Sequence, residues 1–581
     1  MNGRAGRGRR ILIALIGTAV LGLATASGAL GADRVYWGNG DDTISYANLD
    51  GSGGGHELSL AGATPNRIRG LAIDSATGRI YWGNSGNDTI SYANLDGTGG
   101  GDELNISGAN PNYIHGLSID PAARRVYWAN DNGNSISYAN LDGTGGGHEL
   151  DITGATPDQP YGVALDPAGG RIFWANVSVD TSTISYAHLD GSGGDELDIS
   201  GAMANKPHGV AIDPTAGRIY WGNISSTIFY ANLDGGGGHE LSLSGSHPSG
   251  PVGVAVDPTA GRIYWANLGK PTISYAKLDG TGGGGELDLS GANPNALRFL
   301  VLLRTPAGAG APQVTGGSRV GSVLACSQGS WAPDLPGAFL YRAPHELTYR
   351  WTRNGADIPG ATDGTYTAYA AGRYRCRVTA TNAAGATSQT SDQHTISSPP
   401  ASHTLAVSVF GSGNGTVTGP GISCPRDCVG TYADGTSVLL SARPASRSSF
   451  AGWGGACSGR RVCRVKMTAG RTVTARFARL PNTEITGAKI DPANQRASFE
   501  FKALGGSKGF QCALAKPKKD ETPRPQFSNC RSPKSYTALA PGRYTFFVRA
   551  FNAGGRDPTP ARKSFTSHAP TASGGGMAAA R

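Results

Sequence analysis

The chain has 581 residues and a formal net charge of +9 at pH 7, with 38% apolar residues and 89 glycines. This length allows several domains. Beyond the first 32 residues we expect no stretch apolar enough to cross a bilayer, which excludes a protein with several membrane-spanning helices.

The first 32 residues have the order of parts typical of a secretory signal peptide. Four arginines within the first ten residues precede the apolar run of residues 11–23, and small residues follow as far as Ala32. A membrane anchor is the alternative, but a run of this length is too short to span a bilayer. We therefore expect an exported mature protein, secreted or associated with the cell envelope, that does not span the membrane after cleavage.

A motif of the form Arg-aliphatic-aromatic-Trp-Gly/Ala-Asn then recurs along the chain. The copies begin at Arg34, Arg79, Arg125, Arg171, Arg218 and Arg262. Counted between the aromatic residues before the tryptophans, the steps are 45, 46, 46, 47 and 44 residues. A fixed period of this length, made of short β-type runs, predicts a propeller or a solenoid.

Each repeat divides into four strand-length pieces. In the copy that starts at Gly70 these pieces are residues 70–74, 79–82, 89–94 and 103–106. Gly, Asn, Asp and Pro fill the connections, where they supply the backbone angles of turns. Four strands per repeat, six repeats and no helical periodicity predict an all-β fold, a six-bladed β-propeller over residues 33–304.

Residues 33–304 resemble the YWTD (class B) repeats of the low-density lipoprotein receptor family, which form six-bladed propellers. The resemblance rests on the Tyr-Trp core, the Leu-Asp-Gly turns and the strand Gly-aliphatic-Ala-aliphatic-Asp. The chain departs from the motif itself, where Gly or Ala followed by Asn replaces Thr-Asp in all six copies. An amide can still bridge backbone groups as donor and acceptor. We therefore expect the fold of the family, but not the ligand of its receptors.

The two ends of the repeat region indicate how the ring closes. The chain enters at the second strand of a blade, residues 34–37, and the missing first strand recurs as Leu297–Leu303. Pairing of these two strands leaves no long edge strand. The closing copy has Phe299 in place of Gly and Leu303 in place of Asp, as expected for an atypical terminal repeat.

The sequence contains no motif that carries catalysis or binds a cofactor or metal. A Ser-His-Asp arrangement beside a nucleophile elbow, a zinc-protease motif and a phosphate loop are all missing, so we predict no catalytic residue, cofactor or metal. One aspartate recurs in almost every repeat, which indicates a structural turn. These aspartates are Asp74, Asp120, Asp166, Asp213 and Asp257.

The position just before the first-strand glycine varies from blade to blade, unlike the rest of the repeat. Because the first strand lines the channel of a propeller, these side chains are the candidate ligand site at the channel mouth. They are Arg69, His115, Tyr161, His208, Val252 and, in the closing copy, Arg298. Arg, His and Tyr suit an anionic or sugar-like ligand. The loops on the same face add Asp41, Asp42, Asp88, Asp131 and Asp180. The alternative is that all of these are solvated rim residues.

Residues 305–400 open with a linker rich in Pro, Gly and Ala. They resemble an immunoglobulin-like domain, since Cys326, Trp351 and Cys376 follow in that order and Tyr374 lies two residues before the second cysteine. The first interval is long, so we expect an inserted loop around Ala332–Pro344.

Two further modules and a tail complete the chain. Residues 401–479 resemble the divergent internalin-type B repeat of bacterial surface and secreted proteins, on the cysteine-bearing segments Cys424-Pro-Arg-Asp-Cys428 and Phe450-Ala-Gly-Trp-Gly-Gly-Ala-Cys457. Residues 480–568 resemble an immunoglobulin- or fibronectin-like module, with an alternating strand at 542–552. Residues 569–581 have low complexity and are predicted to be disordered. The predicted architecture is thus a propeller followed by three small β-sandwich-like modules.

All eight cysteines lie after residue 320 and fall into local pairs, which in an exported chain predicts disulfides. The predicted bonds are Cys326–Cys376, Cys424–Cys428, Cys457–Cys463 and Cys512–Cys530. Two alternatives remain for the middle four cysteines. They could cross between their two pairs, or they could bind zinc, although no histidine accompanies them.

The net charge conceals a division along the chain. Residues 33–304 hold 14 Lys and Arg against 29 Asp and Glu, whereas residues 305–581 hold 33 against 13. The cations gather at Arg373–Arg377, Arg460–Lys466 and Lys516–Lys519. Each half could simply be soluble. Alternatively, the basic half adheres to an anionic polymer of the cell envelope or to a lipid surface; we expect no nucleic-acid partner.

Taken together, these features favour a secreted or surface-associated protein without enzymatic activity. The propeller would be the platform for an unknown protein or glycan ligand, and the β modules a stalk. The first alternative is a lyase or hydrolase acting on a polysaccharide or a lactone-type substrate, with His115 and His208 as acid and base. That alternative requires perturbed pKa values and hydrogen-bond reach between the two histidines. The second alternative is a purely structural surface protein.

Overall fold

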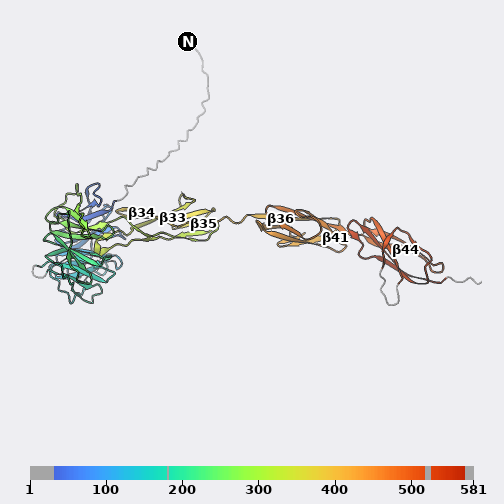
Figure 1. Cartoon of the computed structure of the whole chain (residues 1–581), viewed down its shortest axis with the longest axis horizontal. Coiled ribbons are helices and arrows are strands. Elements are labelled where there is room, and N and C mark those ends of the chain that lie inside the picture. The colour runs from blue at the N-terminus through green and yellow to red at the C-terminus, as the bar shows by residue number, and fades with distance from the viewer. Residues whose placement is uncertain (1–31, 179–181, 517–524, 570–581) are drawn as a thin grey trace, which may run out of the picture. The chain divides into compact units, whose positions relative to one another are not determined.

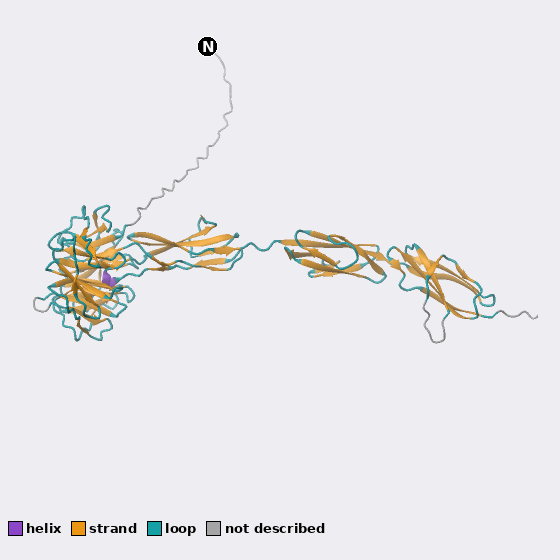
Figure 2. Cartoon of the chain, viewed as in Figure 1, coloured by secondary structure: helices purple, strands orange, loops and turns teal. Residues whose placement is uncertain are grey.

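The computed structural model describes residues 32–178, 182–516 and 525–569 (Figures 1 and 2). In these residues the regular structure consists of β-strands apart from one short 3₁₀ helix, which confirms the predicted all-β class. The chain divides into two compact units, Met1–Ser398 and Pro399–Arg581. Residues 1–31 of the predicted signal peptide and residues 570–581 of the predicted tail lie outside the described residues. None of the described helices is long and apolar enough to cross a membrane.

The first unit begins with a β-propeller of four-stranded antiparallel sheets, coloured from blue to green in Figure 1. The sheet made from both ends of the repeat region is β24 (Leu300–Leu303), β1 (Arg34–Gly38), β2 (Ile44–Asn48) and β3 (Gly55–Glu57). The next two sheets are β4 (Ile68–Asp74), β5 (Arg79–Asn84), β6 (Thr89–Asn94) and β7 (Asp102–Leu104), then β8 (Ile114–Asp120), β9 (Arg125–Asn130), β10 (Ser135–Asn140) and β11 (Gly147–Glu149).

Three more sheets of the same pattern follow in chain order. They are β12 (Pro160–Asp166), β13 (Arg171–Asn176), β14 (Ile184–His188) and β15 (Gly194–Glu196); β16 (Pro207–Asp213), β17 (Arg218–Asn223), β18 (Thr227–Asn232) and β19 (His239–Glu240); and β20 (Pro251–Asp257), β21 (Arg262–Asn267), β22 (Ile273–Lys277) and β23 (Gly285–Glu286). The predicted closing contact is present, because β24 pairs antiparallel with β1 from Arg34↔Leu303 to Trp37↔Leu300. The strand is shorter than the predicted span of residues 297–303.

The innermost strands contact one another around the ring, and β24 contacts both β20 and β4. They come closest at the repeated glycine of each first strand. A Cβ atom on Gly116 would lie 2.6 Å from the Val163 nitrogen, and one on Gly209 would lie 2.7 Å from the Val252 carbonyl oxygen. Only glycine lets the backbones approach this closely. The channel is therefore narrow at this level, and the variable residue before each glycine lies above the constriction.

The docked module (residues 305–398) belongs to the same compact unit as the propeller. Its strands are β25 (Gly308–Gly310) with β28 (Ser330–Trp331); β26 (Val314–Gly316), β27 (Val323–Cys326) and β32 (Thr365–Thr367); and β31 (Ala356–Asp357), β30 (Glu346–Arg353), β33 (Gly372–Asn382) and β34 (Gly385–Thr390), with β35 (His394–Ile396) paired to β33. Trp351 is fully buried beside the Cys326–Cys376 disulfide, and the Tyr374 hydroxyl donates to the Ala370 carbonyl at 2.8 Å, as in a tyrosine corner.

The insertion predicted at Ala332–Pro344 enters the propeller. Its 3₁₀ helix η1 (Pro336–Ala338) contacts the first strands β8, β12, β16 and β20. The next strand, β29 (Leu340–Tyr341), pairs parallel with β24. Phe339, Leu340 and Tyr341 are buried in the propeller core. This segment, hereafter the plug (residues 335–341), closes the channel at the end where the repeated aspartates lie.

The second compact unit contains two further β modules. The first of them, the B-repeat module (residues 402–479), has two four-stranded sheets. One is β39 (Val429–Ala433), β36 (Ser402–Gly411), β43 (Arg471–Arg479) and β41 (Ser448–Gly455). The other is β38 (Ile422–Cys424), β37 (Gly415–Gly419), β40 (Ser437–Pro444) and β42 (Cys463–Lys466). The C-terminal module has one sheet of β44 (Asn482–Asp491), β45 (Arg496–Leu504) and β48 (Lys534–Tyr536). Its other sheet is β47 (Ser528–Cys530), β46 (Gly509–Ala515), β49 (Gly542–Asn552) and β50 (Gly555–Arg556), with β51 (Ala561–Ser567) paired to β49.

The four disulfides are those predicted from the local cysteine pairs. They join Cys326 to Cys376, Cys424 to Cys428, Cys457 to Cys463 and Cys512 to Cys530. The crossed pairing of the middle four cysteines does not occur. Since all eight sulfur atoms form disulfides, none can serve as the zinc thiolate of the alternative interpretation.

Candidate functional site

The candidate site is the channel mouth, at the end of the propeller opposite the plug. Each of its side chains comes from the second position of a first strand or, for Arg298, from just before β24. The structure therefore places all six sequence-predicted residues at one level. They are Arg69, His115, Tyr161, His208, Val252 and Arg298.

A row of aromatic rings runs across the mouth. The His115 ring centroid is 3.9 Å from that of Tyr161, and the Tyr161 centroid is 4.6 Å from that of His208. Tyr113 lies 5.2 Å from His115 on the other side. Phe299, from the opposite side of the ring, stacks on Tyr161 with a centroid separation of 5.7 Å. The rings therefore provide an apolar floor above the glycine constriction.

The residue Phe299 was not predicted to belong to the site. Its signal in the sequence is the departure from Gly in the closing repeat, which the repeat pattern alone explains as a feature of a terminal copy. The structure gives the reason for the departure, because this side chain is buried and fills the centre of the channel against Tyr161.

His115 is the most deeply buried polar side chain of the mouth, with 2% of its surface exposed. Neither ring nitrogen has a hydrogen-bond partner among the described residues. Its nearest acid is Asp131, with 3.5 Å between His115 Nε2 and Asp131 Oδ2. Burial, reinforced by the charge of Arg69, holds the pKa of His115 well below its usual range. The imidazole is therefore neutral at pH 7 and can donate one hydrogen bond.

Two guanidinium groups, Arg69 and Arg298, add positive charge that the protein does not balance. Burial and the charge of Arg69 lower the pKa of Arg298. The Nε atoms of both arginines are buried without a hydrogen-bond partner, and among the described residues neither forms an ion pair. Burial raises the pKa of Asp131, and the positive charge of Arg69 offsets only part of this rise. Two cations beside a single carboxyl group leave a net positive charge at the mouth, which favours the binding of an anion.

Most of the predicted acidic rim has a structural role instead. The Asp42 carboxylate accepts the backbone N–H of Ile68 at 3.3 Å, and Asp88 accepts that of Tyr113 at 2.5 Å. Each bond joins one blade to the next. Asp41 accepts only the hydroxyl of neighbouring Thr43. Asp42 and Asp88 thus hold neighbouring blades together, while Asp131 lies beside His115 at the mouth. Asp180 lies outside the described residues.

The geometry also tests the acid–base pair required by the enzymatic alternative. Burial lowers the pKa of His208 as well as that of His115. However, the ring of Tyr161 lies between the two histidines, tilted against His115 and edge-to-face with His208. His208 Nδ1 is within 2.8 Å of the Lys206 carbonyl oxygen. The perturbed pKa values are present, but the two histidines do not form a hydrogen-bonded pair.

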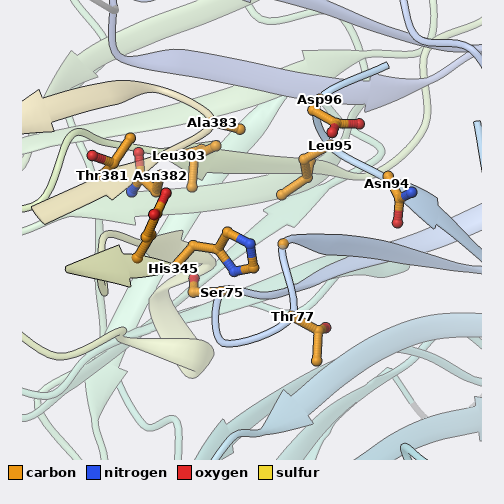
Figure 3. Close-up of a pocket in the computed structure, with 12 residues that line it drawn as sticks. Ser75, Thr77, Asn94, Leu95, Asp96, Leu303, His345, Thr381, Asn382 and Ala383 are labelled. Atoms are coloured by element: carbon orange, nitrogen blue, oxygen red, sulfur yellow. The ribbon is translucent and has the colours of Figure 1, made fainter. Parts of the chain in front are cut away.

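A second hollow lies where the docked module meets the propeller (Figure 3). This cavity of about 380 Å³ is lined by Ser75, Thr77, Asp96, His345 and Asn382 among others. Its polar groups are already engaged. His345 Nδ1 is 3.1 Å from the Ala76 carbonyl oxygen, and Asn382 donates to the Arg304 carbonyl oxygen at 2.8 Å. The cavity is part of the contact between the two domains. No cluster of three or more metal-ligating side chains is found in the described residues.

One segment of the chain matches a known family. Residues 405–481 match the family model of the divergent InlB B-repeat domain. This agrees with the resemblance seen in residues 401–479. The match covers a small part of the chain and concerns this module alone. Together with the disulfides, such a module is typical of extracellular or surface proteins. A comparison with curated proteins finds no match.

Solved structures similar to the chain include propellers of differing function. A nidogen–laminin complex aligns with 18% identity and a TM-score of 0.40, covering 47% of this chain and 98% of the other. A gluconolactonase from Xanthomonas campestris aligns with 16% identity and a TM-score of 0.34, covering 48% and 95%. A putative 6-phosphogluconolactonase from Bacteroides uniformis aligns with 19% identity and a TM-score of 0.31, covering 44% and 81%. Similarity at this level does not indicate a ligand or an activity.

Proposed function

We propose that the chain is an extracellular or surface binding protein whose repeats form a six-bladed, YWTD-like propeller. The mouth of this propeller binds the carboxylate of an acidic sugar at the end or branch of a glycan. The observation that carries the proposal is the unbalanced charge of Arg69 and Arg298 beside buried, unpartnered His115.

The residues divide the ligand between them. The carboxylate accepts hydrogen bonds from the two guanidinium groups, and the neutral imidazole of His115 donates a further one. The half-buried ring of Tyr161, which packs against the buried ring of Phe299, offers an apolar face on which the carbon face of a sugar ring can stack. Because the plug closes the other end of the channel, the ligand enters from the mouth side and the docked module lies away from it.

The experiment is a binding titration of the whole mature chain with a uronic-acid oligosaccharide and with the same oligosaccharide reduced to the neutral sugar. We expect the acidic form to bind and the neutral form to lose roughly 10- to 100-fold in affinity, because a hydrogen bond to a charged group contributes about 1.5–3 kcal/mol. Arg298→Gln should cause a loss of the same size. The control is Arg125→Gln, which removes a guanidinium stacked on Tyr138 at the blade surface.

Three outcomes would contradict the proposal. Equal binding of the acidic and neutral forms would exclude recognition of the carboxylate. No binding, with Arg298→Gln unchanged in stability, would favour a purely structural protein. Cleavage of the oligosaccharide that His115→Gln abolishes would favour the enzymatic alternative.

A further inference from the structure

A second charged surface lies in the C-terminal module, far along the sequence from the propeller. Its sheet of β46, β47, β49, β50 and β51 contains no Asp or Glu in any strand. The nearest acid, Asp557, directly follows β50 and is 2% exposed. The other sheet of the module is mixed, because Glu484, Asp491 and Glu500 lie there among lysines and Arg496. Among the strands of this module, the acidic residues are therefore confined to one sheet, and the other sheet carries only positive charge.

Four arginines of the basic sheet lie on the same face of that sheet. Strand β49 alternates, with Tyr544, Phe546 and Val548 in the core and the intervening residues on the outer face. Strand pairing adds two arginines to that face, since directly opposed residues point to the same side of a sheet. Arg562 lies opposite Phe547, and Arg556 lies opposite Phe551.

This outer surface is hereafter the arginine face (Arg543, Phe547, Arg549, Phe551, Arg556 and Arg562). At about 3.3 Å per residue, Arg543 and Arg549 are separated by roughly 20 Å along the strand. The other two arginines lie beside this line. Such a spread exceeds the size of one small anion and matches a linear polymer with repeated negative charges.

One arginine of the face, Arg549, is held in a fixed position by its neighbours. The Arg549 Nε–H donates to Gln511 Oε1 at 3.1 Å, and its guanidinium carbon lies 3.9 Å from the ring centroid of Phe527. No ion pair to this arginine is found within the described residues. Burial and the charge of Arg556 lower the pKa of Arg549, and no acid among the described residues offsets its charge. A fixed, planar guanidinium with free outer nitrogens suits a carboxylate or sulfate.

The aromatic residues of the face are half-buried, and the Phe551 ring lies over the neighbouring strand. Phe547 and Phe551 are half-buried, and the Phe551 ring covers β46, with its Cζ atom 2.8 Å from where a Cβ of Gly509 would be. A flat ring can stack on a sugar but does not project far enough to insert into a lipid layer.

We propose that the arginine face binds an acidic polysaccharide, with its carboxylates or sulfates on the arginines and its sugar rings over Phe547 and Phe551. This site is independent of the propeller mouth, since it uses a different module and recognises a repeated charge along a chain.

The test uses the whole mature chain and polygalacturonate, with the fully methyl-esterified polymer as the neutral probe of the same backbone. We expect binding to the acidic polymer only, and a loss of affinity of at least tenfold between 50 and 500 mM salt. The double variant Arg549→Gln/Arg562→Gln should bind roughly tenfold or more weakly. The matched control is Lys489→Gln/Lys502→Gln, which removes the same charge from the other sheet and should change affinity less than about twofold.

Two further variants test the chemistry of the contact and its place in the molecule. The single variant Arg549→Lys retains the charge but loses the planar fork, so it should bind with intermediate affinity. Arg125→Gln, at a blade surface outside both proposed sites, should leave polymer binding unchanged. Unaltered binding by the double variant would overturn the proposal. So would tighter binding to a single-stranded oligonucleotide or to anionic vesicles than to the polysaccharide.

Discussion

At the scale of single residues, the asparagine that ends each copy of the Trp motif has a definite structural role. Asn84 Oδ1 accepts from Trp82 Nε1 at 3.1 Å and from the Asn66 backbone N–H at 2.9 Å. Its Nδ2 donates to the hydroxyls of Thr89 and Ser91, both at 2.9 Å. An amide supplies donors and acceptor together, as expected from the sequence. The network repeats at Asn39, Asn130, Asn176 and Asn267.

One blade departs from this arrangement. Phe229 occupies the position of the second hydroxyl, and Asn223 Nδ2 donates to the Met203 carbonyl oxygen at 3.0 Å instead. Trp221 Nε1 turns to the same carbonyl at 3.2 Å. The departure follows from loss of a hydroxyl partner, because a buried amide must find another acceptor.

The network predicts a large difference between two neighbouring asparagines. Asn84→Ala should lower the free energy of unfolding of the propeller by about 2–4 kcal/mol, because it leaves buried donors on Trp82 and Asn66 without an acceptor. Asn87→Ala should change it by less than about 0.5 kcal/mol, since that side chain is exposed. Calorimetric unfolding of both variants is the measurement. Equal effects would mean that the amide network does not stabilise the fold.

Burial of His115 predicts that ligand binding at the mouth depends on pH. In the free protein the pKa of His115 lies well below 6.5, so the imidazole is neutral near pH 7. A bound anion favours the imidazolium and raises that pKa, so binding should take up protons and affinity should rise as pH falls from 8 to 6. Calorimetry in two buffers of different ionisation heat measures the uptake. His115→Gln should abolish it, and an affinity independent of pH would argue against contact between the anion and His115.

The stability of the unliganded propeller should respond to pH in the opposite direction. Below the pKa of about 6.5 in the unfolded chain, unfolded histidine binds a proton that folded His115 and His208 do not. The folded state is therefore disfavoured as pH falls from about 6.5 towards the lower pKa values in the folded protein. The melting temperature should fall over this range. His115→Gln/His208→Gln should flatten the dependence, and an unchanged slope would contradict the assignment.

At the scale of elements, the plug connects the docked module to the propeller core. Besides the β24–β29 pairing, Arg304 at the end of β24 forms ion pairs with Asp33, at 2.8 Å, and with Asp257. Asp334, before the plug, accepts the backbone N–H groups of Arg342 and Ala343, both at 2.7 Å, and so fixes the base of the loop. Segments from both ends of the propeller and from the next module thus meet at one place.

Truncation within the plug should destabilise the propeller, although the plug lies outside the repeats. Leu340 is fully buried, so Leu340→Ala should cost about 2–5 kcal/mol of unfolding free energy. Val323→Ala is the control in the same module, because Val323 is 60% exposed and should cost less than about 0.5 kcal/mol. Calorimetry of the propeller transition compares the two. A normal transition in Leu340→Ala would show that the plug contributes little.

At the scale of the whole molecule, the natural division of the chain follows Ser398. A division at residue 304 would separate β24 from β29 and remove the plug from the channel. The predicted boundary at residue 304 thus crosses a shared core, since buried residues on both sides of it pack together.

Fragments divided at the two positions should behave differently. Residues 33–398 should unfold cooperatively at the temperature of the first unit in the whole chain. Residues 33–304 should melt lower and associate, because loss of the plug exposes Leu302 and Leu303 and leaves the side of β24 that pairs with β29 unpaired. Scanning calorimetry and size-exclusion chromatography distinguish the fragments. Equal stability would place the boundary at residue 304 after all.

The sequence alone determined the features that depend on local pattern. The period of the Trp motif predicted the strands and their order, and the close spacing of cysteines such as Cys424 and Cys428 predicted their pairing. The variable position before each first-strand glycine predicted which residues reach the mouth, because every repeat has the same geometry. The tertiary structure decided what depends on contacts between distant segments. The sequence places Asp42, Asp88 and Asp131 on the same face, yet Asp42 and Asp88 bind the backbone of the next blade while Asp131 faces His115. The loop at 332–344 could be recognised as an insertion, but its place in the channel follows from burying Phe339, Leu340 and Tyr341 against strands more than a hundred residues earlier in the chain. No local pattern encodes such a contact.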